Sequence, residues 1–374
     1  MVSPARVIAT QQLVANGQSP WLDFIRRDLL TSGQFAKMVK DGWVTGVTSN
    51  PTIFEKAIAG SNDYDDALAA LASKGPIGAY DAFVEIASDD IRGAADGLRG
   101  VYDATSGVDG YVSFELPPGI ERDVAASVKE AKRLFTLLDR PNVMIKVPGT
   151  QEGCEALREL IAAGVNVNMT LMFALSVYEQ CVEAYFAGLE QRLAAGQPIN
   201  QLSSVASFFV SRVDTAVDGK LPADSPLRGK IAIANARVVY GHFMKRHSGP
   251  RWKKLKAAGA RVQRPLWAST GTKNPAYSDV MYVEGLVAAD TINTMPEATI
   301  HALLDHGHVK PSIVDAIPAA EQDLAAAKAA GIDLDAVTAK LLVDGLASFE
   351  GDFTKLLGRV ESGMAQKRSG TATR

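Results

Sequence analysis

Short runs of hydrophobic residues alternate along the chain with longer segments in which apolar positions recur at the spacing of an amphipathic helix. Most of the short runs are apolar at nearly every position, which is typical of strands in a parallel sheet covered on both faces. Eight of these runs are predicted to be strands. They are SPWLDFI from Ser19, VTGVTSNP from Val44, GYVSFEL from Gly110, NVMIKVP from Asn142, GVNVNMTLMF from Gly164, SSVASFFV from Ser203, RPLWAST from Arg264 and AADTIN near Ala289.

Helix signals lie between these runs. EGCEALRELIAAG ends on Gly164, and glycine is the residue that most often ends a helix. SVYEQCVEAYFAGLEQRLAAG begins with Ser176 and has Glu179 three residues later, which predicts a capping box. Eight strands that alternate with helices indicate an α/β protein with a (β/α)8 barrel. A doubly wound open sheet is the alternative, but the Gly-rich turn that usually follows its first strand is missing.

The length of the chain fits one barrel with additional helices. The chain has 374 residues, whereas a barrel of this kind needs about 250. We expect a single domain over residues 1–374, with the barrel core at about 19–310 and a C-terminal helical extension at about 311–362. A further helical region is expected at about 215–260. Residues 363–374 are mostly small and polar, which predicts a flexible tail.

The composition argues against several classes of protein. It is 47% hydrophobic and 22% charged, as in soluble globular proteins. The net charge of −3 gives no basic footprint for nucleic acid. No apolar run approaches the roughly 20 residues that span a bilayer, and the N-terminal residues lack the apolar core of a signal peptide. We therefore expect a cytoplasmic protein without a membrane partner, and the sequence leaves a homo-oligomer open.

Neither the cysteines nor the histidines predict a metal site. Cys154 and Cys181 are the two cysteines of the chain. They form no disulfide framework, and we expect both to be buried in helices. His301, His306 and His308 cluster in HALLDHGH, but their spacing does not place them on one helical face.

Lys146 stands out because four apolar residues surround it in the run VMIKV. Burying a charged amine is costly, and the usual relief is loss of the proton, which makes the amine a nucleophile. Lys146 is therefore a candidate for imine chemistry with a carbonyl substrate. The commoner alternative is a strand-end lysine whose stem packs while its amine reaches water.

Polar residues near the ends of the other predicted strands favour the first interpretation. In a (β/α)8 barrel, the catalytic groups lie at the C-terminal ends of the strands. These positions hold Asp23, Asn50, Glu115, Lys146, Asn168 with Thr170, Ser207 with Arg212, and Ser269. Carboxylates, amides, hydroxyls and an amine would thus converge on one mouth of the barrel.

At these residues the sequence resembles the transaldolase family, in its longer-chain branch. The resemblance extends from about Trp21 to about Thr299 and lies in WLDFIRRDL, GVTSNPTIF, SFEL, IKVPGTQEG, GVNVNMTLMF, SFFVSRVD and WASTGTKNP. It implies a class I, imine-forming barrel enzyme of the pentose phosphate pathway that needs neither cofactor nor metal. Such an enzyme transfers a dihydroxyacetone unit from sedoheptulose 7-phosphate to glyceraldehyde 3-phosphate, which gives erythrose 4-phosphate and fructose 6-phosphate.

The resemblance also implies catalytic roles. Lys146 would attack the ketose carbonyl as a neutral amine, the form that burial in an apolar barrel favours. Asp23 would be the base that takes the proton of the C4 hydroxyl, although a strand-end or helix-capping aspartate is the alternative. Glu115 and Thr170 would hold the water that moves protons during imine formation.

Substrate-binding roles follow in the same way. Asn50, Asn168 and Ser207 would bind substrate hydroxyls, although Asn50 before Pro51 is also a common turn device. The role of Asn168 stays open. The phosphate would be bound by Arg212, Ser269 and Lys273.

Two features concern the residues of the phosphate site. Shorter transaldolases carry an arginine two residues after the serine, where this chain has Gly271, and we expect Lys273 to replace it. Arg212 could instead pair with Asp214 or with a neighbouring helix.

Three other functions compete with a transferase. An aldolase of the same superfamily would release dihydroxyacetone, but such relatives are much shorter and replace the relay glutamate. A pyridoxal-phosphate barrel also uses a strand lysine and would be yellow. A catalytically inactive binding module would have little reason to keep Asp23, Glu115, Lys146 and Thr170 together.

Overall fold

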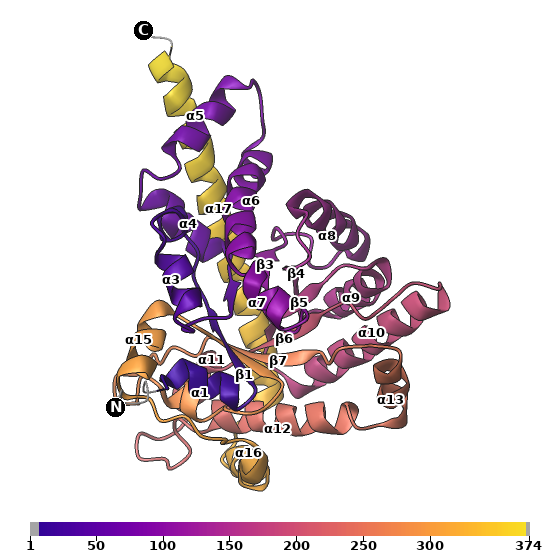
Figure 1. Cartoon of the computed structure of the whole chain (residues 1–374). Helices are drawn as coiled ribbons and strands as arrows, with labels where there is room; N and C mark the ends of the chain where they lie inside the picture. Colours follow the sequence, from indigo (N-terminus) through magenta and orange to yellow (C-terminus); the bar gives the residue numbers. More distant parts are fainter. Residues whose placement is uncertain (1–6, 372–374) are drawn as a thin grey trace, which may run out of the picture.

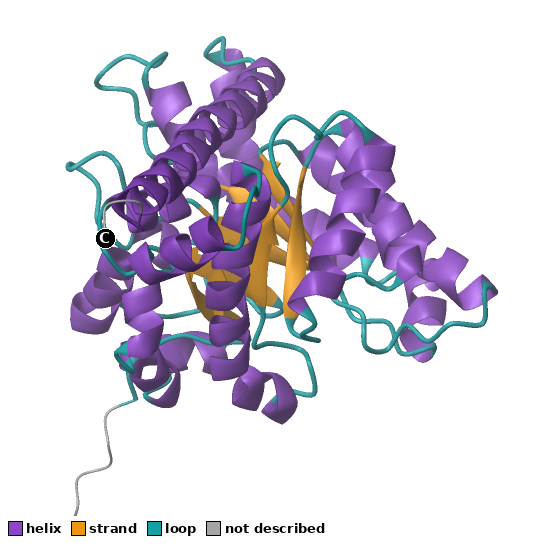
Figure 2. Ribbon diagram, turned by 90° about the horizontal axis from the view of Figure 1, so that it is seen from above, coloured by secondary structure: helices purple, strands orange, loops and turns teal. Residues whose placement is uncertain are grey.

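The computed structural model describes residues 7–371, and their side chains as far as residue 368. Its strands are β1 (Gln18–Leu22), β2 (Gly46–Thr48), β3 (Val112–Glu115), β4 (Val143–Pro148), β5 (Val167–Met172), β6 (Ser204–Phe209), β7 (Arg264–Ala268) and β8 (Thr291–Met295). They form a closed parallel barrel in chain order, with helices around it (Figures 1 and 2). Each strand overlaps a predicted run, so the barrel is confirmed and the open sheet is wrong.

Helices follow the strands and cover the outside of the barrel. The helices are α1 (Ala9–Ala15), α2 (Arg27–Thr31), α3 (Gln34–Lys40), α4 (Pro51–Ala59), α5 (Asp65–Ser73), α6 (Ala79–Gly97), α7 (Arg99–Ala104), α8 (Val124–Leu138), α9 (Gln151–Ala163), α10 (Leu175–Ala194), α11 (Ser211–Asp218), α12 (Ile231–Arg246), α13 (Pro250–Ala257), α14 (Met281–Glu284), α15 (Glu297–His306), the short 3-10 helix η1 (Val314–Ala316), α16 (Ile317–Ala329) and α17 (Leu334–Thr371). The helical region expected at about 215–260 is confirmed.

The two predictions about helix ends had different outcomes. Gly164 ends α9 in a left-handed conformation with φ 91°, as predicted. The capping box at Ser176 is wrong, because α10 is capped by Ala174 and Ser176 lies inside its first turn. Glu179 instead bonds to Nδ1 of His242 in α12 at 2.6 Å. Glu179 thus contacts His242 in another helix instead of capping the start of its own helix.

The register of the strands determines which side chains enter the barrel. Glu115 of β3 lies opposite Lys146 of β4, and Lys146 lies opposite Asn168 of β5. Side chains alternate between the two faces of a strand, so Met144 shares the inward face with Lys146, two residues earlier. The polar residues therefore occupy the C-terminal half of the barrel interior.

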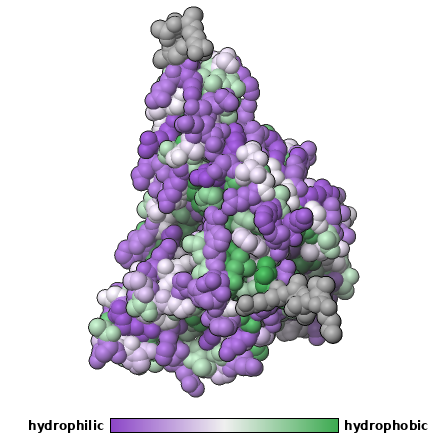
Figure 3. Space-filling view, turned by 60° about the vertical axis from the view of Figure 1, so that its left-hand side comes forward, coloured by the Kyte–Doolittle hydropathy of each residue, from purple (hydrophilic) through white to green (hydrophobic). Residues whose placement is uncertain are grey.

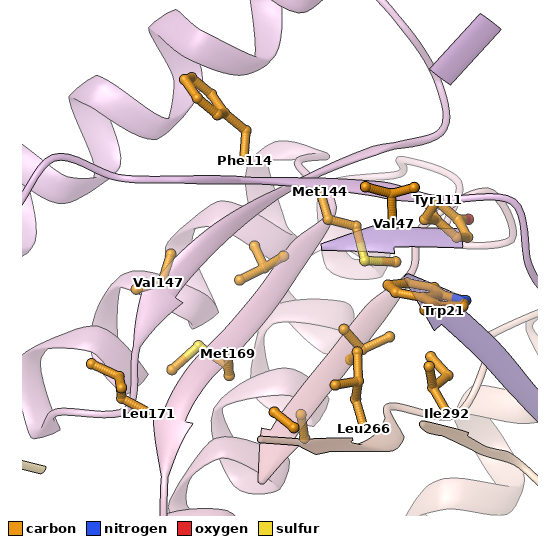
Figure 4. Packing of buried hydrophobic residues seen from close by; sticks show 14 of the residues in the cluster. Trp21, Val47, Tyr111, Phe114, Met144, Val147, Met169, Leu171, Leu266 and Ile292 are labelled. Atoms are coloured by element: carbon orange, nitrogen blue, oxygen red, sulfur yellow. The ribbon is translucent and has the colours of Figure 1, made fainter. Parts of the chain in front are cut away.

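A layer of large apolar side chains fills the barrel below Lys146. Trp21, Met144, Leu266 and Ile292 are fully buried and lie between the strands in Figure 4. Trp21 also requires a small neighbour on β2, because a Cβ at Gly46 would overlap its indole ring. This layer closes the barrel from below, so a ligand can approach Lys146 only from the C-terminal mouth.

The C-terminal extension is longer than the sequence predicts. Helix α17 continues to Thr371 instead of ending near residue 362. Met364 is buried, and Nζ of Lys367 lies 2.8 Å from Oδ2 of Asp65 in α5. Residues 363–371 of the predicted tail thus continue helix α17, whereas residues 372–374 lie outside the described part. The small, polar composition of this segment gave no sign that Met364 is buried or that Lys367 pairs with Asp65.

One face of the molecule is mainly hydrophilic (Figure 3). Figure 3 shows one face of the molecule, with its hydrophobic side chains gathered mainly near the middle. Within residues 7–371, no helix combines the length and the apolar character needed to cross a membrane. The two cysteines are buried as predicted, and their Sγ atoms lie 3.1 Å apart between α9 and α10.

Candidate active site

A pocket of about 410 Å³ opens at the C-terminal ends of the barrel strands. Eight predicted site residues line it, namely Asp23, Asn50, Lys146, Thr170, Ser207, Arg212, Ser269 and Lys273. The other two, Glu115 and Asn168, lie directly behind it, where they contact Lys146 and Ser207. A larger groove of about 620 Å³ lies on the outer helices α9, α10 and α12, away from all these residues.

Lys146 and Glu115 form a buried pair at the centre of the site. Nζ of Lys146 lies 2.7 Å from Oε2 of Glu115 and donates a hydrogen bond to the carbonyl oxygen of Ser49 at 2.9 Å. Lys146 is 4% exposed and Glu115 is 9% exposed. Burial raises the pKa of Glu115, and the nearby charge of Lys146 opposes this shift. A lysine that packs only its stem and extends its amine into water is therefore excluded.

Two buried oxygens near the Lys146 amine, one from Thr170 and one from Glu115 itself, have no hydrogen-bond partner among the described residues. Oγ1 of Thr170 and Oε1 of Glu115 form no hydrogen bond with any residue in the described part of the chain. Thr170 belongs to β5 and Glu115 to β3, the two strands that neighbour β4. Buried polar atoms normally have partners, so both oxygens have hydrogen-bonding capacity left for a ligand.

Asp23 follows β1 and faces the same pocket. Its Oδ1 accepts a hydrogen bond from Oγ1 of Thr48 at 2.7 Å. Burial raises the pKa of Asp23, while the positive charge of Lys146 and the Thr48 hydrogen bond oppose the shift. Asp23 caps no helix, since α2 is capped by Arg26. Sequence analysis missed Thr48, although alternation along β2 places it on the inward face with Gly46.

Asn50 caps a helix and also lines the pocket. Its Oδ1 accepts a hydrogen bond from the amide of Ile53 at 3.0 Å and so caps α4, with Pro51 in the first turn. The same residue lines the pocket. Because the cap uses only Oδ1, the role in the turn and a role in substrate binding are compatible.

Asn168 supports the pocket from behind. It is fully buried, and its Nδ2 donates to Oγ of Ser113 at 3.0 Å. Its Oδ1 accepts a hydrogen bond from Oγ of Ser207 at 2.6 Å. Ser207 therefore reaches the pocket wall, whereas Asn168 holds Ser207 in position.

Arg212 is directed to the pocket rather than to Asp214. Its guanidinium lies 5.3 Å from the ring centroid of Phe209, and it lines the pocket. Asp214 instead accepts hydrogen bonds from the amide of Ala232 at 2.8 Å and from the hydroxyl of Tyr282 at 2.9 Å. The proposed pairing of Arg212 with Asp214 is therefore wrong.

Further hydroxyl and cationic groups surround the outer part of the pocket. Ser269 follows β7 with φ 56°, a left-handed conformation that few residues other than glycine adopt, and its Oγ lies 3.0 Å from Oγ of Ser211. Lys273 and Lys56 also line the pocket. Lys56 lies on α4, not at a strand end, so the strand-end rule could not identify it. Three cations together make the mouth suitable for an anionic group.

The histidine cluster lies elsewhere. His306 bonds to Oδ1 of Asp279 at 2.9 Å, and the ring of His301 packs edge-on against Trp43. Within residues 7–371, no group of three or more His, Cys, Asp or Glu side chains is placed to hold a metal ion.

Known proteins match nearly the whole chain. The family described as Transaldolase/Fructose-6-phosphate aldolase matches residues 20–360. A protein of Frankia alni named transaldolase is 46% identical over 366 residues, which cover 96% of this chain and 98% of the relative. Transaldolase 1 of Streptomyces coelicolor is 45% identical over 365 residues, with 96% of each chain covered. Transaldolase 2 of a Nostoc species is 43% identical over 361 residues, with 92% and 94% covered.

Proposed function

Because the chain belongs to the transaldolase/fructose-6-phosphate aldolase family, we infer that it acts as a transaldolase on sugar phosphates, and we propose that Lys146 forms the imine. The reaction moves a dihydroxyacetone unit from sedoheptulose 7-phosphate to glyceraldehyde 3-phosphate, and it yields erythrose 4-phosphate and fructose 6-phosphate. The observation that carries this proposal is the Lys146 amine, buried in the barrel and 2.7 Å from Glu115.

The first step requires an amine without its extra proton. The raised pKa of Glu115 makes this carboxylate a suitable acceptor for that proton, because the transfer leaves two neutral groups in a buried site. The amine nitrogen of Lys146 then attacks the ketose carbonyl. Loss of water gives the imine, and a water held by Glu115 and Thr170 carries protons to and from the departing oxygen.

The second step breaks the C3–C4 bond of the bound sugar. Asp23 takes the proton of the C4 hydroxyl, the C4 oxygen forms the aldehyde, and the bonding electrons move to the protonated imine to give an enamine. The acceptor aldehyde then reacts with this enamine, and Asp23 returns the proton. Thr48 fixes the carboxylate that performs both transfers.

The remaining pocket residues bind the substrate. Asn50 and Ser207 are placed for the hydroxyls near the imine. Arg212, Ser269 and Lys273 form the phosphate site, because a guanidinium fork and an ammonium beside a hydroxyl suit phosphate oxygens. Lys273 takes over the cationic role that Gly271 cannot supply.

Borohydride trapping tests the proposal directly. The protein is incubated with fructose 6-phosphate and sodium borohydride, and the modified peptide is identified by mass spectrometry. We expect a reduced adduct on Lys146 and none in Lys146→Ala. Asp23→Ala should still form the adduct but lose bond cleavage, since Asp23 acts after the imine. A label on any other lysine would exclude the mechanism.

Assays also separate the competing functions. An aldolase would release dihydroxyacetone rapidly from fructose 6-phosphate alone, whereas a transaldolase should require erythrose 4-phosphate as acceptor. The purified protein should be colourless, and a yellow protein would favour pyridoxal phosphate. The cytoplasmic location stays a proposal that cell fractionation would test.

A further inference from the structure

Helix α17 lies across the mouth of the barrel. It packs against α4, α5, α6, α11 and strand β5, and it is the long yellow helix of Figure 1. Its approach is close at Gly345, where a Cβ would lie 3.1 Å from Leu171 and 3.6 Å from a guanidinium nitrogen of Arg212. Thr52 of α4 hydrogen-bonds to Asp352 of α17. The helix is thus fixed on both sides of the pocket.

An apolar face of α17 covers Glu115. Leu346, Phe349 and Phe353 follow one another at the spacing of a single helix face. Leu346 and Phe349 line a cavity of about 10 Å³ beside Glu115, and Phe353 lines a second cavity of about 10 Å³, also beside Glu115. A cavity needs at least about 10–15 Å³ to hold one water. Each cavity between α17 and Glu115 therefore has room for at most about one water.

Phe349 occupies a special position on this face. It lines the substrate pocket together with Lys146, and it also lines the small cavity beside Glu115. Its side chain is 6% exposed. The ring therefore separates the catalytic pair from the solvent at the edge of the pocket.

We propose that Phe349 is a specificity-determining residue that excludes bulk water from the enamine and so favours transfer over hydrolysis. The proposal rests on the transaldolase function argued above.

The chemistry explains why water matters at this point. After the first aldehyde leaves, the enamine waits for an acceptor. If its carbon takes a proton instead, that proton stays on the carbon and an iminium forms. Water then adds to the iminium carbon and gives up one of its own protons to the group that donated the first, and the C–N bond breaks. The net reaction consumes one water and releases dihydroxyacetone and the free Lys146 amine. A side chain that keeps water away from the enamine slows this hydrolysis and leaves the rate of transfer to the acceptor unchanged.

Replacing Phe349 should change the fate of the enamine. Dihydroxyacetone release from fructose 6-phosphate alone is measured and compared with transfer to erythrose 4-phosphate. In Phe349→Ala, we expect the ratio of hydrolysis to transfer to rise by about tenfold or more. In D2O, the released dihydroxyacetone should carry one carbon-bound deuterium, which marks protonation of the enamine.

Phe353→Ala is the matched control. It removes the same ring from the same helix face, but Phe353 does not line the substrate pocket, so the ratio should stay near that of the parent protein. Phe349→Leu keeps an apolar side chain and should give an intermediate ratio. If Phe349→Ala fails to fold, the ratio measured for Phe349→Leu tests the proposal.

The outcomes separate this inference from the proposed function. An unchanged ratio in the Phe349 variants overturns the inference, as does an equal rise in Phe353→Ala, which would indicate general loosening of α17. If the parent protein shows no borohydride adduct on Lys146, the proposed function itself fails. An adduct together with unchanged ratios rejects only the role of Phe349.

Discussion

The Lys146 amine has two oxygen neighbours with different properties. The Ser49 carbonyl is a fixed backbone acceptor, whereas Glu115 is an acid whose pKa is raised by burial. One neighbour can therefore only orient the amine, and the other can also exchange a proton with it. This difference lets the same site hold the amine in place and change its charge.

The hydrogen bond from Thr48 should set the acid limb of activity. It stabilises ionised Asp23, so Thr48→Val should raise the pKa of Asp23 further. Because Asp23 is the proposed base, the acid limb of kcat/KM should move to higher pH, by about one pH unit. Thr48→Ser keeps the hydroxyl and should leave the limb in place. An unchanged profile in Thr48→Val would show that Asp23 does not limit the rate at low pH.

The sequence predicted the site residues that occupy strand ends, because register and alternation bring those positions to one mouth. It did not predict Lys56 or Phe349, which reach the pocket from helices. Their approach depends on how α4 and α17 pack, and no local pattern encodes that packing. The strand-end rule identified Asn168, but this side chain is fully buried behind the pocket and holds Ser207 instead of lining the pocket wall. The rule does not predict how deep in the barrel a side chain lies.

At the scale of elements, the strands were predictable because a parallel sheet buried on both faces leaves nearly continuous apolar runs. Helix ends were predicted less well. Ser176 and Glu179 fit a local capping pattern, but Glu179 forms its bond with His242 of α12. The end of α17 was missed for a similar reason, since its partners lie in α5, far away in sequence.

Truncation tests the last turns of α17. Deleting residues 363–374 removes buried Met364 and the Lys367–Asp65 pair. We expect the free energy of unfolding to fall by about 2–3 kcal/mol, mostly from the lost apolar burial, since exposed ion pairs contribute little. Urea denaturation measures the change. Deleting only the residues after Arg368 should have a smaller effect, and equal stability of both truncated proteins would contradict this account.

At the scale of the whole molecule, one buried carboxylate should make stability depend on pH. Asp214 is buried between α11, α12 and α14, and burial raises its pKa to about 6. In the unfolded chain its pKa is about 3.9. Between these values folded Asp214 binds more protons than unfolded Asp214, so its contribution to stability must fall as pH rises from about 4 to about 6.

Asp214→Asn should remove this contribution. The free energy of unfolding of the parent protein should lose up to roughly 3 kcal/mol relative to the variant across this range. Urea titrations at several pH values measure the difference between the two proteins, which cancels the contributions of other carboxylates. Parallel curves for parent and variant would show that Asp214 does not titrate there.

The pairing of β1 with β8 has a consequence for association. Every strand of the closed barrel has a neighbouring strand on each side. The folded barrel therefore exposes no edge strand with which a strand of a second chain could pair. An incompletely folded chain lacks this protection, because the contact that seals the ring joins segments far apart in sequence and is slow to form. Aggregation during refolding should therefore start from ring-open species and become more severe at higher protein concentration.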